Sequence, residues 1–499
     1  MKVEGMDKLL PGTKASTPIL PRVHLRGLGL RASERVLMLL LVDLALLVAS
    51  LVLAVVVRTE WLTSADAFFA LWRWWLTLAI LWWVVAQFLE VYDLARAAIA
   101  PQSMLAAGGA AAITVALYHA IPVFTPPLLS RGLSLIFMLA AVGSVMIWRG
   151  VYAVLFVQPA FETRLLVVGA GTAGRALART FHRDDEEGAL NPYRGTGYRI
   201  VGFLDDDPDK PAGSRVAGLP VLGSIEGLVA QAKQLKPDMI VLAITHRHTM
   251  SQGAFDALVE CRALGYQVTT MTDVYERALG RVPVEHVGRN IPAVLPVDDR
   301  GPADRLYWAA KRIGDVILSA VFLLPMAVVI PLVLLLNLLG NRGPLFYRQV
   351  RVGRGGRPFT VNKFRTMLPD AEGKTGAVWA AQDDPRVTPV GRFLRKARID
   401  ELPQLLNVLR GEMSLIGPRP ERPEFVDSLA QVIPYYRARH AVRPGISGWA
   451  QVRYGYGNTI EDARTKLEYD LYYVRHAGFY LDALIVLKTI ATMLKLQGR

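Results

Sequence analysis

Long apolar runs dominate the first third of the chain. They cover residues 36–57, about 67–89, about 104–124 and about 133–157. A helix needs roughly 20 apolar residues to cross the hydrocarbon core of a bilayer, and each run reaches that length. The pattern therefore predicts a bundle of four transmembrane helices at residues 33–158, which follows a tail at residues 1–32.

Basic residues around the first run predict its orientation. The tail and the start of the run hold Lys2, Lys8, Lys14, Arg22, Arg26, Arg31 and Arg35, whereas the loop that follows has only Arg58. Flanks rich in Lys and Arg stay in the cytoplasm. We expect a cytoplasmic tail, and four crossings then return the chain to the cytoplasm.

Three charged residues interrupt the runs. Arg73 and Arg149 lie near the ends of their spans, so we expect their long side chains to reach the membrane surface. Asp43 lies inside the first span. An ionisable residue within the membrane can mark a functional site, and such a role for Asp43 stays open.

A segment with a different periodicity follows at residues 160–297. It opens with TRLLVVGAGTAGRALARTF, in which a strand-like run leads through Gly169, Gly171 and Gly174 into an alanine-rich helical pattern. YRIVGFLDDDP, GLPVLGSIEGLV and KPDMIVLAI then alternate strand-like and helix-like patterns. Strands that alternate with helices predict a parallel sheet covered on both faces, so we expect an α/β Rossmann-like, doubly wound domain.

The GxGxxG turn is typical of dinucleotide sites, in which the glycines let a pyrophosphate approach the start of a helix. Those sites have an acidic residue about 20 positions further on. Here the first acidic residue after the second strand is Asp205, 34 positions past Gly171. No Tyr and Lys pair with the spacing of a nucleotide-sugar dehydratase or epimerase is seen nearby. We therefore favour a structural or regulatory domain over cofactor binding at the three glycines.

A fifth apolar run lies at residues 312–340. Asp315 is near its start, Pro325 and Pro331 interrupt it, and basic residues flank both ends (Lys311 and Arg312; Arg342 and Arg348). Proline removes a helix hydrogen bond and bends the axis, and cations on both flanks favour two cytoplasmic ends. We expect a re-entrant helix that enters and leaves on the same face. A fifth complete span is the alternative.

Charge and composition narrow the choice of partner. The 499-residue chain is 52% hydrophobic with a net charge of +14, and residues 341–443 hold 19 Lys or Arg against 10 Asp or Glu. Guanidinium groups bind phosphate oxygens bidentately, and glycine-rich turns expose N–H groups to anions. We expect a phosphate-bearing partner and no nucleic acid, because no recognised nucleic-acid signature is present. The single Cys261 excludes a disulfide framework and a Cys-based metal site.

The basic segment surrounds one acidic pair. Asp400 and Glu401 lie in LRKARIDELPQLLNVLRGEMSLIGPRPERPE, together with Arg395, Lys396, Arg398, Arg410, Arg419 and Arg422. Surface helices often mix charges, so spacing alone does not distinguish a solvated face from a reaction site. Pro403 is tolerated only in a first helical turn and Gly411 can end a helix, which predicts a helix that begins near Asp400.

The order of the motifs closely resembles the bacterial sugar transferases. RQVRVGRGGRPF, VNKFRTM, RKARIDELPQLLNVLRGEMSLIGPRPERPEF, VRPGISGWAQV and KLEYDLYYV carry the resemblance over about residues 305–499. The long form of this family has four transmembrane helices and a Rossmann-like domain ahead of the catalytic part, so the resemblance extends along the whole chain. It implies a mainly α catalytic domain at residues 298–499 with the re-entrant helix at about 312–340.

The resemblance implies a polyprenyl-phosphate hexose-1-phosphate transferase of the exopolysaccharide type, on the cytoplasmic face of the bacterial inner membrane. Such an enzyme moves a hexose phosphate from a UDP-sugar to undecaprenyl phosphate and releases UMP. Glucose or galactose is the implied hexose, with glucose favoured. Mg²⁺ is the implied cofactor and membrane lipids are further partners. The oligomeric state stays open, with a homodimer as one option.

Roles for individual residues follow from the same resemblance. Asp400 is the implied nucleophile, which forms a covalent phosphosugar, and Glu401 binds Mg²⁺ with it or positions it. The nearby cations are expected to lower the pKa of Asp400 and keep it ionised. Arg395 and Arg419 are the favoured phosphate contacts, ahead of Lys363, Arg365 and Arg398; Gln451 and Asp470 are expected to touch the nucleotide or support the pocket.

Two other functions stay open. One is a membrane-tethered nucleotide-sugar epimerase or oxidoreductase that uses the Rossmann-like domain, and a tightly held NAD would support it. The other is a non-catalytic polysaccharide export scaffold whose basic domain binds lipid headgroups. Only the transferase would lose its chemistry, while keeping its fold, on replacement of Asp400.

Overall fold

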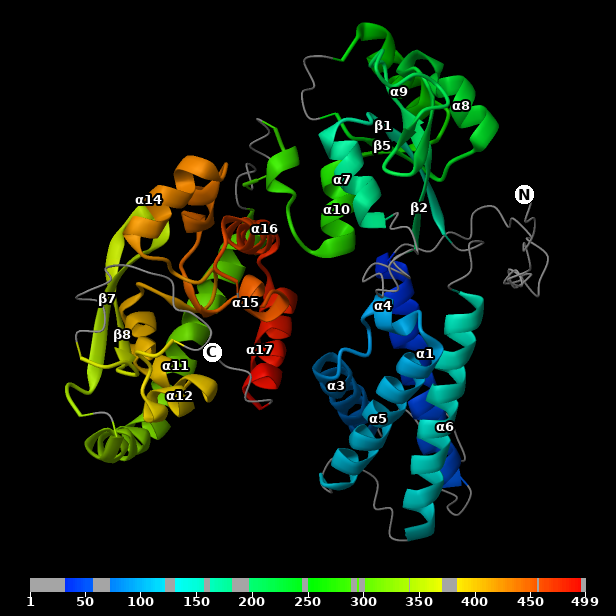
Figure 1. Cartoon of the computed structure of the whole chain (residues 1–499). Coiled ribbons are helices and arrows are strands. Elements are labelled where there is room, and N and C mark those ends of the chain that lie inside the picture. The colour runs from blue at the N-terminus through cyan, green and yellow to red at the C-terminus, as the bar shows by residue number, and fades with distance from the viewer. Residues whose placement is uncertain are drawn as a thin grey trace, which may run out of the picture.

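The computed structural model describes residues 32–56, 72–121, 131–156, 162–181, 197–244, 250–288, 294–295, 301–340, 342–369, 384–455 and 457–494. A helical bundle, an α/β domain and a mainly helical C-terminal domain follow one another along the chain (Figure 1). The predicted tail at residues 1–32 lies outside the described residues except for Ala32.

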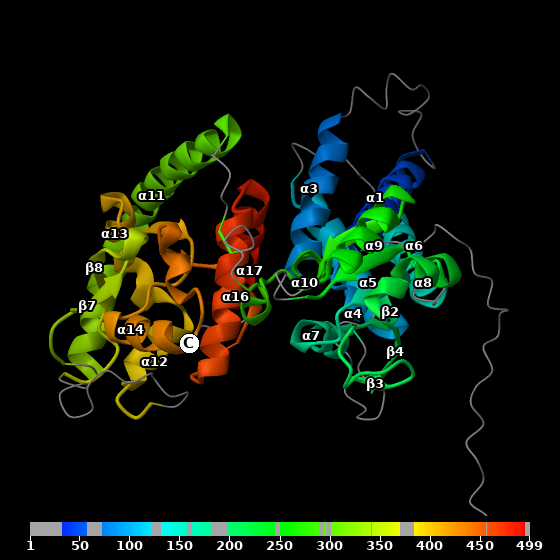
Figure 2. The same ribbon diagram turned by 90° about the horizontal axis from the view of Figure 1, so that it is seen from above.

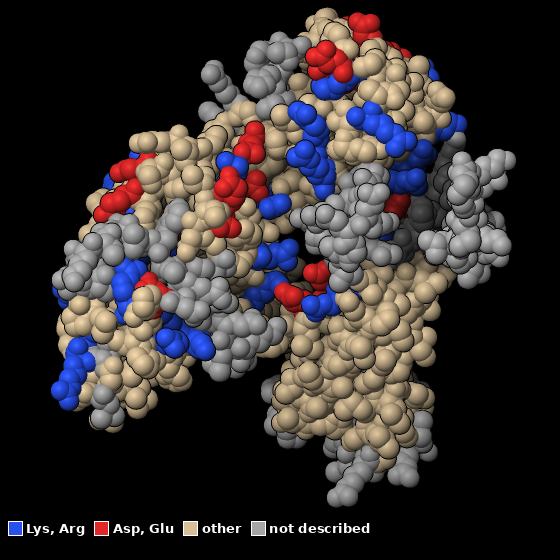
Figure 3. All heavy atoms as spheres, in the orientation of Figure 1, with Lys and Arg blue, Asp and Glu red and all other residues tan. Residues whose placement is uncertain are grey.

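The bundle contains α1 (Ala32–Val56), α3 (Trp72–Phe88), α5 (Ala100–His119) and α6 (Arg131–Leu155), with the short α4 (Leu94–Ala97) before α5. Helices α1, α5 and α6 are long and apolar enough to cross a membrane. The described part of α3 has only 17 residues, and residues 67–71 of the predicted second span lie outside the described residues. On the face seen in Figure 3, the lower part of the bundle is almost free of charged atoms, as a lipid-facing surface requires.

An ion pair is buried inside this bundle. Arg149 Nη2 lies 2.5 Å from Asp43 Oδ2, and both side chains are fully buried. Arg149 also donates to the carbonyl of Val91, and the Tyr92 hydroxyl donates to Asp43. The prediction that Arg149 reaches the membrane surface is therefore wrong: α6 packs on α1, so the guanidinium finds a carboxylate inside the bundle. This pairing gives Asp43 a structural partner.

The α/β domain contains a six-stranded sheet. Its strands are β1 (Thr163–Val168), β2 (Tyr198–Leu204), β3 (Arg215–Val216), β4 (Leu219–Gly223), β5 (Met239–Leu242) and β6 (Gln267–Thr270), in the order β3-β4-β2-β1-β5-β6. All neighbouring pairs are parallel except β3 with β4. The chain turns from one half of the sheet to the other at β1, so the predicted Rossmann-like, doubly wound fold is confirmed.

Helices cover both faces of the sheet (Figure 1). Alternate residues of β1 serve the two faces: Leu165 and Val167 pack with α7 (Thr172–Phe181) and α10 (Met271–Leu279), whereas Leu166 and Val168 pack with α8 (Leu228–Leu235) and α9 (Gln252–Ala263). The near-continuous apolar run of β1 follows from this burial on two sides.

Helix α11 (Pro302–Gly340) carries the fifth apolar run. It has 39 residues and remains helical across Pro325 and Pro331. One stripe of it is buried, at Asp315, Ser319, Met326, Val333 and Asn337, while Leu324 and Val328 on the outside are 73% and 76% exposed. Residues 302–338 form a fourth helix able to cross a membrane, so the chain is a membrane protein. A re-entrant course is not evident in the helix itself and stays a prediction.

The C-terminal domain is mainly helical, as predicted. It contains the antiparallel hairpin β7 (Phe346–Val352) and β8 (Pro358–Phe364), the parallel pair β9 (Ser414–Ile416) and β10 (Gly445–Ser447), and helices α12 (Pro389–Lys396), α13 (Leu405–Arg410), α14 (Pro423–Val432), α15 (Trp449–Arg453), α16 (Ile460–His476) and α17 (Phe479–Leu494). Figure 2 shows α16 and α17 on the side that faces the other two units, with β7, β8 and α13 on the far side.

Polar contacts connect the three units. Glu276 of α10 pairs with Arg475 and His476 of α16, and Trp449 Nε1 donates to the carbonyl of Gly280 at 2.8 Å. Lys488 of α17 lies 2.8 Å from Glu90, just after α3. The C-terminal domain is thus attached to both the α/β domain and the helical bundle.

Candidate active site

The acidic pair lies on a tight turn of helix. Asp400 and Glu401 belong to a 3₁₀ segment, Ile399–Gln404, that continues into α13, and Gly411 ends this helix with φ +84°. Pro403 lies inside the 3₁₀ segment, two residues before α13 begins at Leu405. The helix predicted to begin near Asp400 is therefore present, with a 3₁₀ first turn. Both acidic residues are buried.

Glu401 attracts the surrounding cations. Its Oε1 accepts from Lys363 Nζ at 3.2 Å and from Arg419 Nη2 at 2.8 Å, and its Oε2 lies 3.4 Å from Arg398 Nη1. Burial alone would raise the pKa of Glu401, but Arg419, Lys363 and Arg398 together hold that pKa well below its usual range. Glu401 is therefore a fixed negative charge that gathers three cations in one place.

Asp400, unlike Glu401, is not paired with these cations. Among the residues that the structure describes, its carboxylate has no hydrogen-bond or ion-pair partner. Burial raises the pKa of Asp400, the negative charge of Glu401 raises it further, and Lys363, Arg395 and Arg419 offset only part of this. The nearby cations do lower this pKa, as expected, but burial and the charge of Glu401 outweigh them, so the net shift is upward. Asp400 thus presents free oxygen atoms next to a group of cations.

Two of the predicted phosphate contacts lie at the edge of this group. Arg395, at the end of α12, acts electrostatically on Asp400, and its Nε donates to Thr366 Oγ1 at 2.9 Å. Arg365 donates to the carbonyls of Pro344 and Met367, at 2.7 and 2.8 Å, so it joins the segment before β7 to the segment after β8 at the open end of the hairpin. The structure thus places Arg395 near Asp400 and Glu401, whereas Arg365 has a structural role.

Asn407 attaches the helix of the acidic pair to the hairpin. It is fully buried, donates from Nδ2 to the carbonyl of Thr360 at 2.7 Å, and accepts from the backbone N–H of Asn362 with Oδ1. These bonds fix α13 against β8, the strand that supplies Lys363. Sequence reasoning missed Asn407, because an amide inside a leucine-rich run carries no charge pattern.

Asp470 lies behind the site. Its Oδ2 is 2.6 Å from Arg439 Nη2, and the same guanidinium donates to the carbonyl of Arg419 and, through Nη1, to the Tyr436 hydroxyl. Burial raises the pKa of Asp470 to about 6 although Arg439 lowers it. Asp470 therefore supports Arg419 from behind, through Arg439. Sequence reasoning did not identify Arg439, which is one of many arginines in this segment.

Gln451 is the last of the predicted site residues. It lies on α15, and its Nε2 donates to the carbonyl of Ile446 in β10 at 3.1 Å. Its Oε1 is buried without a hydrogen-bond partner among the described residues. The side chain therefore connects α15 to β10, and contact with a nucleotide stays a prediction.

The carboxylates allow a test of the predicted Mg²⁺ site. Both Glu401 oxygens already accept from cations, whereas both Asp400 oxygens are free of such contacts. The described residues contain no group of three His, Cys, Asp or Glu able to hold a metal. Mg²⁺ often binds through one or two carboxylates, substrate phosphates and water. Asp400 fits such a site, and Glu401 fits only if it releases a cation.

The glycine turn of the α/β domain is closed by its own chain. Gly169 has φ +104°, and a Cβ on Gly174 would lie 2.1 Å from the carbonyl of Gly169, so both glycines are needed for the turn and for packing. A Cβ on Gly171 would meet open space. The N–H of Ala170, however, donates to Asp205 Oδ2 at 2.5 Å. Asp205 thus occupies one backbone N–H of the turn.

Two family models match the chain. Residues 306–496 match the model of the bacterial sugar transferases, and residues 87–250 match a model described as a CoA-binding domain. The second match overlaps the helical bundle and most of the α/β domain.

Several curated proteins are similar to the chain. An Aeromonas hydrophila UDP-N-acetylgalactosamine-undecaprenyl-phosphate N-acetylgalactosaminephosphotransferase is 45% identical over 48% of this chain and 54% of its own length. An Escherichia coli K12 UDP-glucose:undecaprenyl-phosphate glucose-1-phosphate transferase is 33% identical over 65% of this chain and 66% of its own length. The chain thus spans about half to two thirds of these relatives.

A shorter relative is covered more completely. A Caulobacter vibrioides UDP-glucose:undecaprenyl-phosphate glucose-1-phosphate transferase is 44% identical over 40% of this chain and 76% of its own length. Together with the match of residues 306–496, this similarity shows that the chain belongs to the bacterial sugar transferase family.

Proposed function

We propose that this chain transfers a hexose 1-phosphate from a UDP-sugar to undecaprenyl phosphate and releases UMP. The donor, the lipid acceptor and the transferred group are those in the names of the relatives. The observation that supports the chemistry best is the division of roles in the acidic pair: Glu401 holds three cations, and Asp400 keeps a free carboxylate beside them. The product would begin the assembly of an exopolysaccharide, capsule or O-antigen.

The reaction proceeds in two displacements. One oxygen of Asp400 attacks the phosphorus that bears the sugar, the bond between this phosphorus and the bridging oxygen breaks, and UMP leaves with the electron pair. A phosphate oxygen of undecaprenyl phosphate then attacks the same phosphorus, and the bond to Asp400 breaks. The product is undecaprenyl diphosphate-sugar, and the Asp400 carboxylate is restored. Covalent catalysis of this kind divides one difficult step into two easier ones.

The cations offset the charge of the transferring group. Lys363, Arg398 and Arg419 are held by Glu401, and Arg395 approaches from α12, so their remaining N–H groups are placed before the substrate arrives. Preorganised donors of this kind stabilise the charge that develops in the transition state. Bound Mg²⁺, held by Asp400 and the substrate phosphates, would supply further charge neutralisation.

The sugar is tested directly by a panel of donors. The full chain in nanodiscs, with undecaprenyl phosphate and Mg²⁺, is offered UDP-glucose, UDP-galactose and UDP-N-acetylgalactosamine, and the released nucleotide is identified. We expect UMP with at least one donor, in proportion to the lipid added, and we favour UDP-glucose. Release of UDP would contradict the proposal, since it indicates transfer of the sugar without its phosphate. A change of the sugar on its nucleotide would support the epimerase instead.

We also propose that the catalytic domain lies on the cytoplasmic face of the bacterial inner membrane and that α11 is re-entrant. Both halves of α11 contact this one domain: Arg312 donates to the carbonyl of Val408 at 2.6 Å, and Val333 packs against Phe364 and Leu394. A re-entrant course keeps both ends of the helix on the side of the domain.

The course of α11 is tested by labelling single cysteines. Arg305→Cys and Arg342→Cys, at the two ends of the helix, should both react with a membrane-impermeant maleimide only from the cytoplasmic side. The native Cys261 is buried and gives little background. Labelling of either position from the outside would show that α11 is a complete span and would rule out the re-entrant course.

A further inference from the structure

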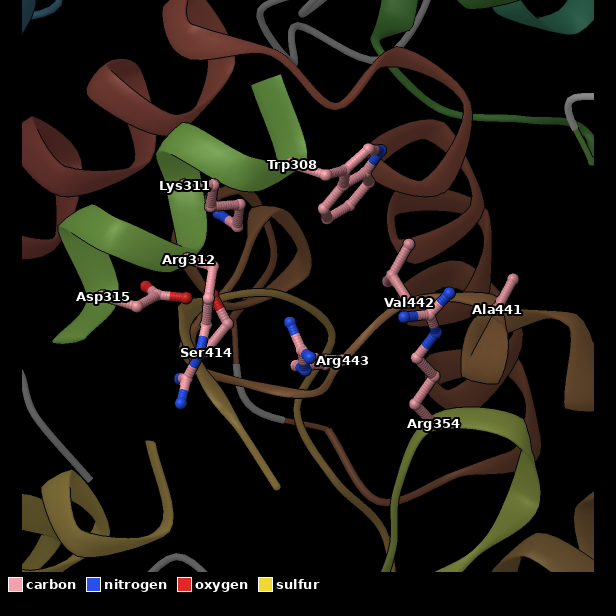
Figure 4. A pocket seen from close by; sticks show the side chains of 9 residues that line it. All are labelled: Trp308, Lys311, Arg312, Asp315, Arg354, Ser414, Ala441, Val442 and Arg443. Atoms are coloured by element: carbon pink, nitrogen blue, oxygen red, sulfur yellow. The ribbon is translucent and has the colours of Figure 1, made fainter. Parts of the chain in front are cut away.

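A small basic cavity lies outside the candidate active site. Its lining residues are Trp308, Lys311, Arg312, Asp315, Arg354, Ser414, Ala441, Val442 and Arg443 (Figure 4). They come from the start of α11, the turn between β7 and β8, β9, and the segment before β10. Basic residues from three distant parts of the sequence (Lys311 and Arg312, Arg354, and Arg443) thus meet at one place. Within the described residues, none of them forms a hydrogen bond or ion pair with Asp400 or Glu401.

The cations of this cavity retain free donors. Arg312 donates to the carbonyls of Val408 and Leu409, at 2.6 and 2.8 Å, and Arg443 Nε donates to the carbonyl of Gly411 at 3.0 Å. A guanidinium has five N–H donors, so each has others to offer. Arg354 is exposed, and its side chain makes no hydrogen bond or ion pair within the described part of the chain.

Negative charge does not balance these cations. Asp315 is the one acidic residue in the lining, and its Oδ1 accepts from the backbone N–H of Leu415 at 3.0 Å. Lys311 is paired with Asp482, at 2.6 Å. Burial lowers the pKa of Arg443, the charges of Arg312 and Arg354 lower it further, and Asp315 offsets only part of this. Three guanidinium groups therefore repel one another across the cavity, and an anion would relieve this repulsion.

The size and position of the cavity restrict the anion. Its volume of about 60 Å³ leaves room for about four to six water molecules, which is enough for a phosphate group. Arg443 of the lining donates to the carbonyl of Gly411. Ten positions of helix, a rise of about 15 Å, separate Gly411 from Glu401, so the cavity is remote from the acidic pair. The apolar part of α11 begins directly beside it, and Trp308 in its wall is a residue type enriched at membrane surfaces.

We propose that this cavity is a second phosphate site, which binds the phosphate group of a membrane lipid through Arg354, Arg312 and Arg443. The lipid tail would follow the exposed apolar face of α11, and the guanidinium groups would hold the phosphate at the depth of the headgroups. The source of the phosphate is either undecaprenyl phosphate or a bulk anionic phospholipid. The site goes beyond the proposed transfer reaction, because it is defined by binding and does not involve the acidic pair.

The proposal is tested by counting bound lipids with native mass spectrometry. The full chain is placed in phosphatidylcholine nanodiscs that contain either undecaprenyl phosphate or phosphatidylglycerol, without UDP-sugar. Arg354→Gln removes the charge of a residue that supports no other part of the structure, so the variant should fold. Arg437→Gln is the matched control, since Arg437 lies close in sequence to Arg443, is exposed and pairs with Asp427.

We expect the wild type and Arg437→Gln to retain one lipid more per chain than Arg354→Gln. The affinity of Arg354→Gln for this lipid should be at least about tenfold weaker than that of the wild type. Loss with undecaprenyl phosphate identifies the polyprenyl lipid as the source, and loss with phosphatidylglycerol identifies bulk phospholipid; either result supports the site. Equal retention by the wild type and Arg354→Gln overturns it. The test uses no UDP-sugar, so a failure of the transfer reaction would leave its result interpretable.

Discussion

Asp400→Asn is expected to lower the rate of sugar-phosphate transfer by about 10³-fold or more, since the amide has nearly the same shape but no anionic nucleophile. Loss of one negative charge beside the diphosphate should leave UDP-sugar binding unchanged or tighter. The rate is measured as UMP release by the full chain in nanodiscs. Binding of the UDP-sugar is measured separately by calorimetry.

The covalent step gives this prediction a second readout. Wild-type protein mixed with UDP-sugar alone should release at most one UMP per site and retain a sugar phosphate on the protein after quenching. Asp427→Asn is the control, because Asp427 is exposed on α14 and pairs only with the exposed Arg437 among the described residues. It should behave like the wild type. Substantial turnover by Asp400→Asn without any adduct would instead favour direct displacement assisted by the cations.

The pH profile follows from the same carboxylate. Burial and Glu401 raise the pKa of Asp400 above its usual value, so the nucleophile becomes protonated at a higher pH than an exposed aspartate. Activity in kcat/KM should therefore fall as the pH drops into the weakly acidic range. Above this pKa the carboxylate is ionised and, because its pKa is raised, more basic. A profile that stays flat down to pH 4.5 would show that Asp400 is not the group that attacks.

The sequence predicted the reacting groups better than their surroundings. Asp400 and Glu401 were identified because a family motif contains them, and the helix start near Asp400 followed from Pro403 and Gly411. The opposite behaviour of the two carboxylates could not be read from the motif. It depends on Lys363 of β8 and Arg419 of the loop after β9, which both form ion pairs with Glu401.

Pairs formed between distant elements were the hardest to foresee. Arg149 and Asp43 are 106 positions apart, and each looked unpaired within its own run. The glycine turn of the α/β domain and the alternation of strands and helices were evident from local patterns, because turns and alternating periodicity are local properties. That Asp205 closes this turn depends on how β1 and β2 align, which no local pattern specifies.

The pair of Arg439 and Asp470 carries the second large effect. Both side chains are almost completely buried, and the pair supports the backbone of Arg419. Removal of one partner from a buried ion pair leaves an uncompensated charge and costs about 3–5 kcal/mol. Arg439→Met should therefore lower the apparent Tm of the catalytic domain by about 10 °C at pH 7.5. Differential scanning fluorimetry of the purified protein measures this shift.

The loss of stability in Arg439→Met should depend on pH in a defined direction. Burial already raises the pKa of Asp470 to about 6, and loss of Arg439 raises it further. An aspartate whose pKa is higher in the folded than in the unfolded protein favours folding below its unfolded value, and this contribution is lost as the pH rises through the folded pKa. The variant should thus approach the wild type at pH 5 and fall behind above pH 6. Arg439→Met with Asp470→Leu removes both charges and should recover part of the stability at pH 7.5. If the double variant is no more stable than Arg439→Met, the loss comes from the hydrogen bonds of Arg439 to Tyr436 and Arg419, and the buried carboxylate is not its cause.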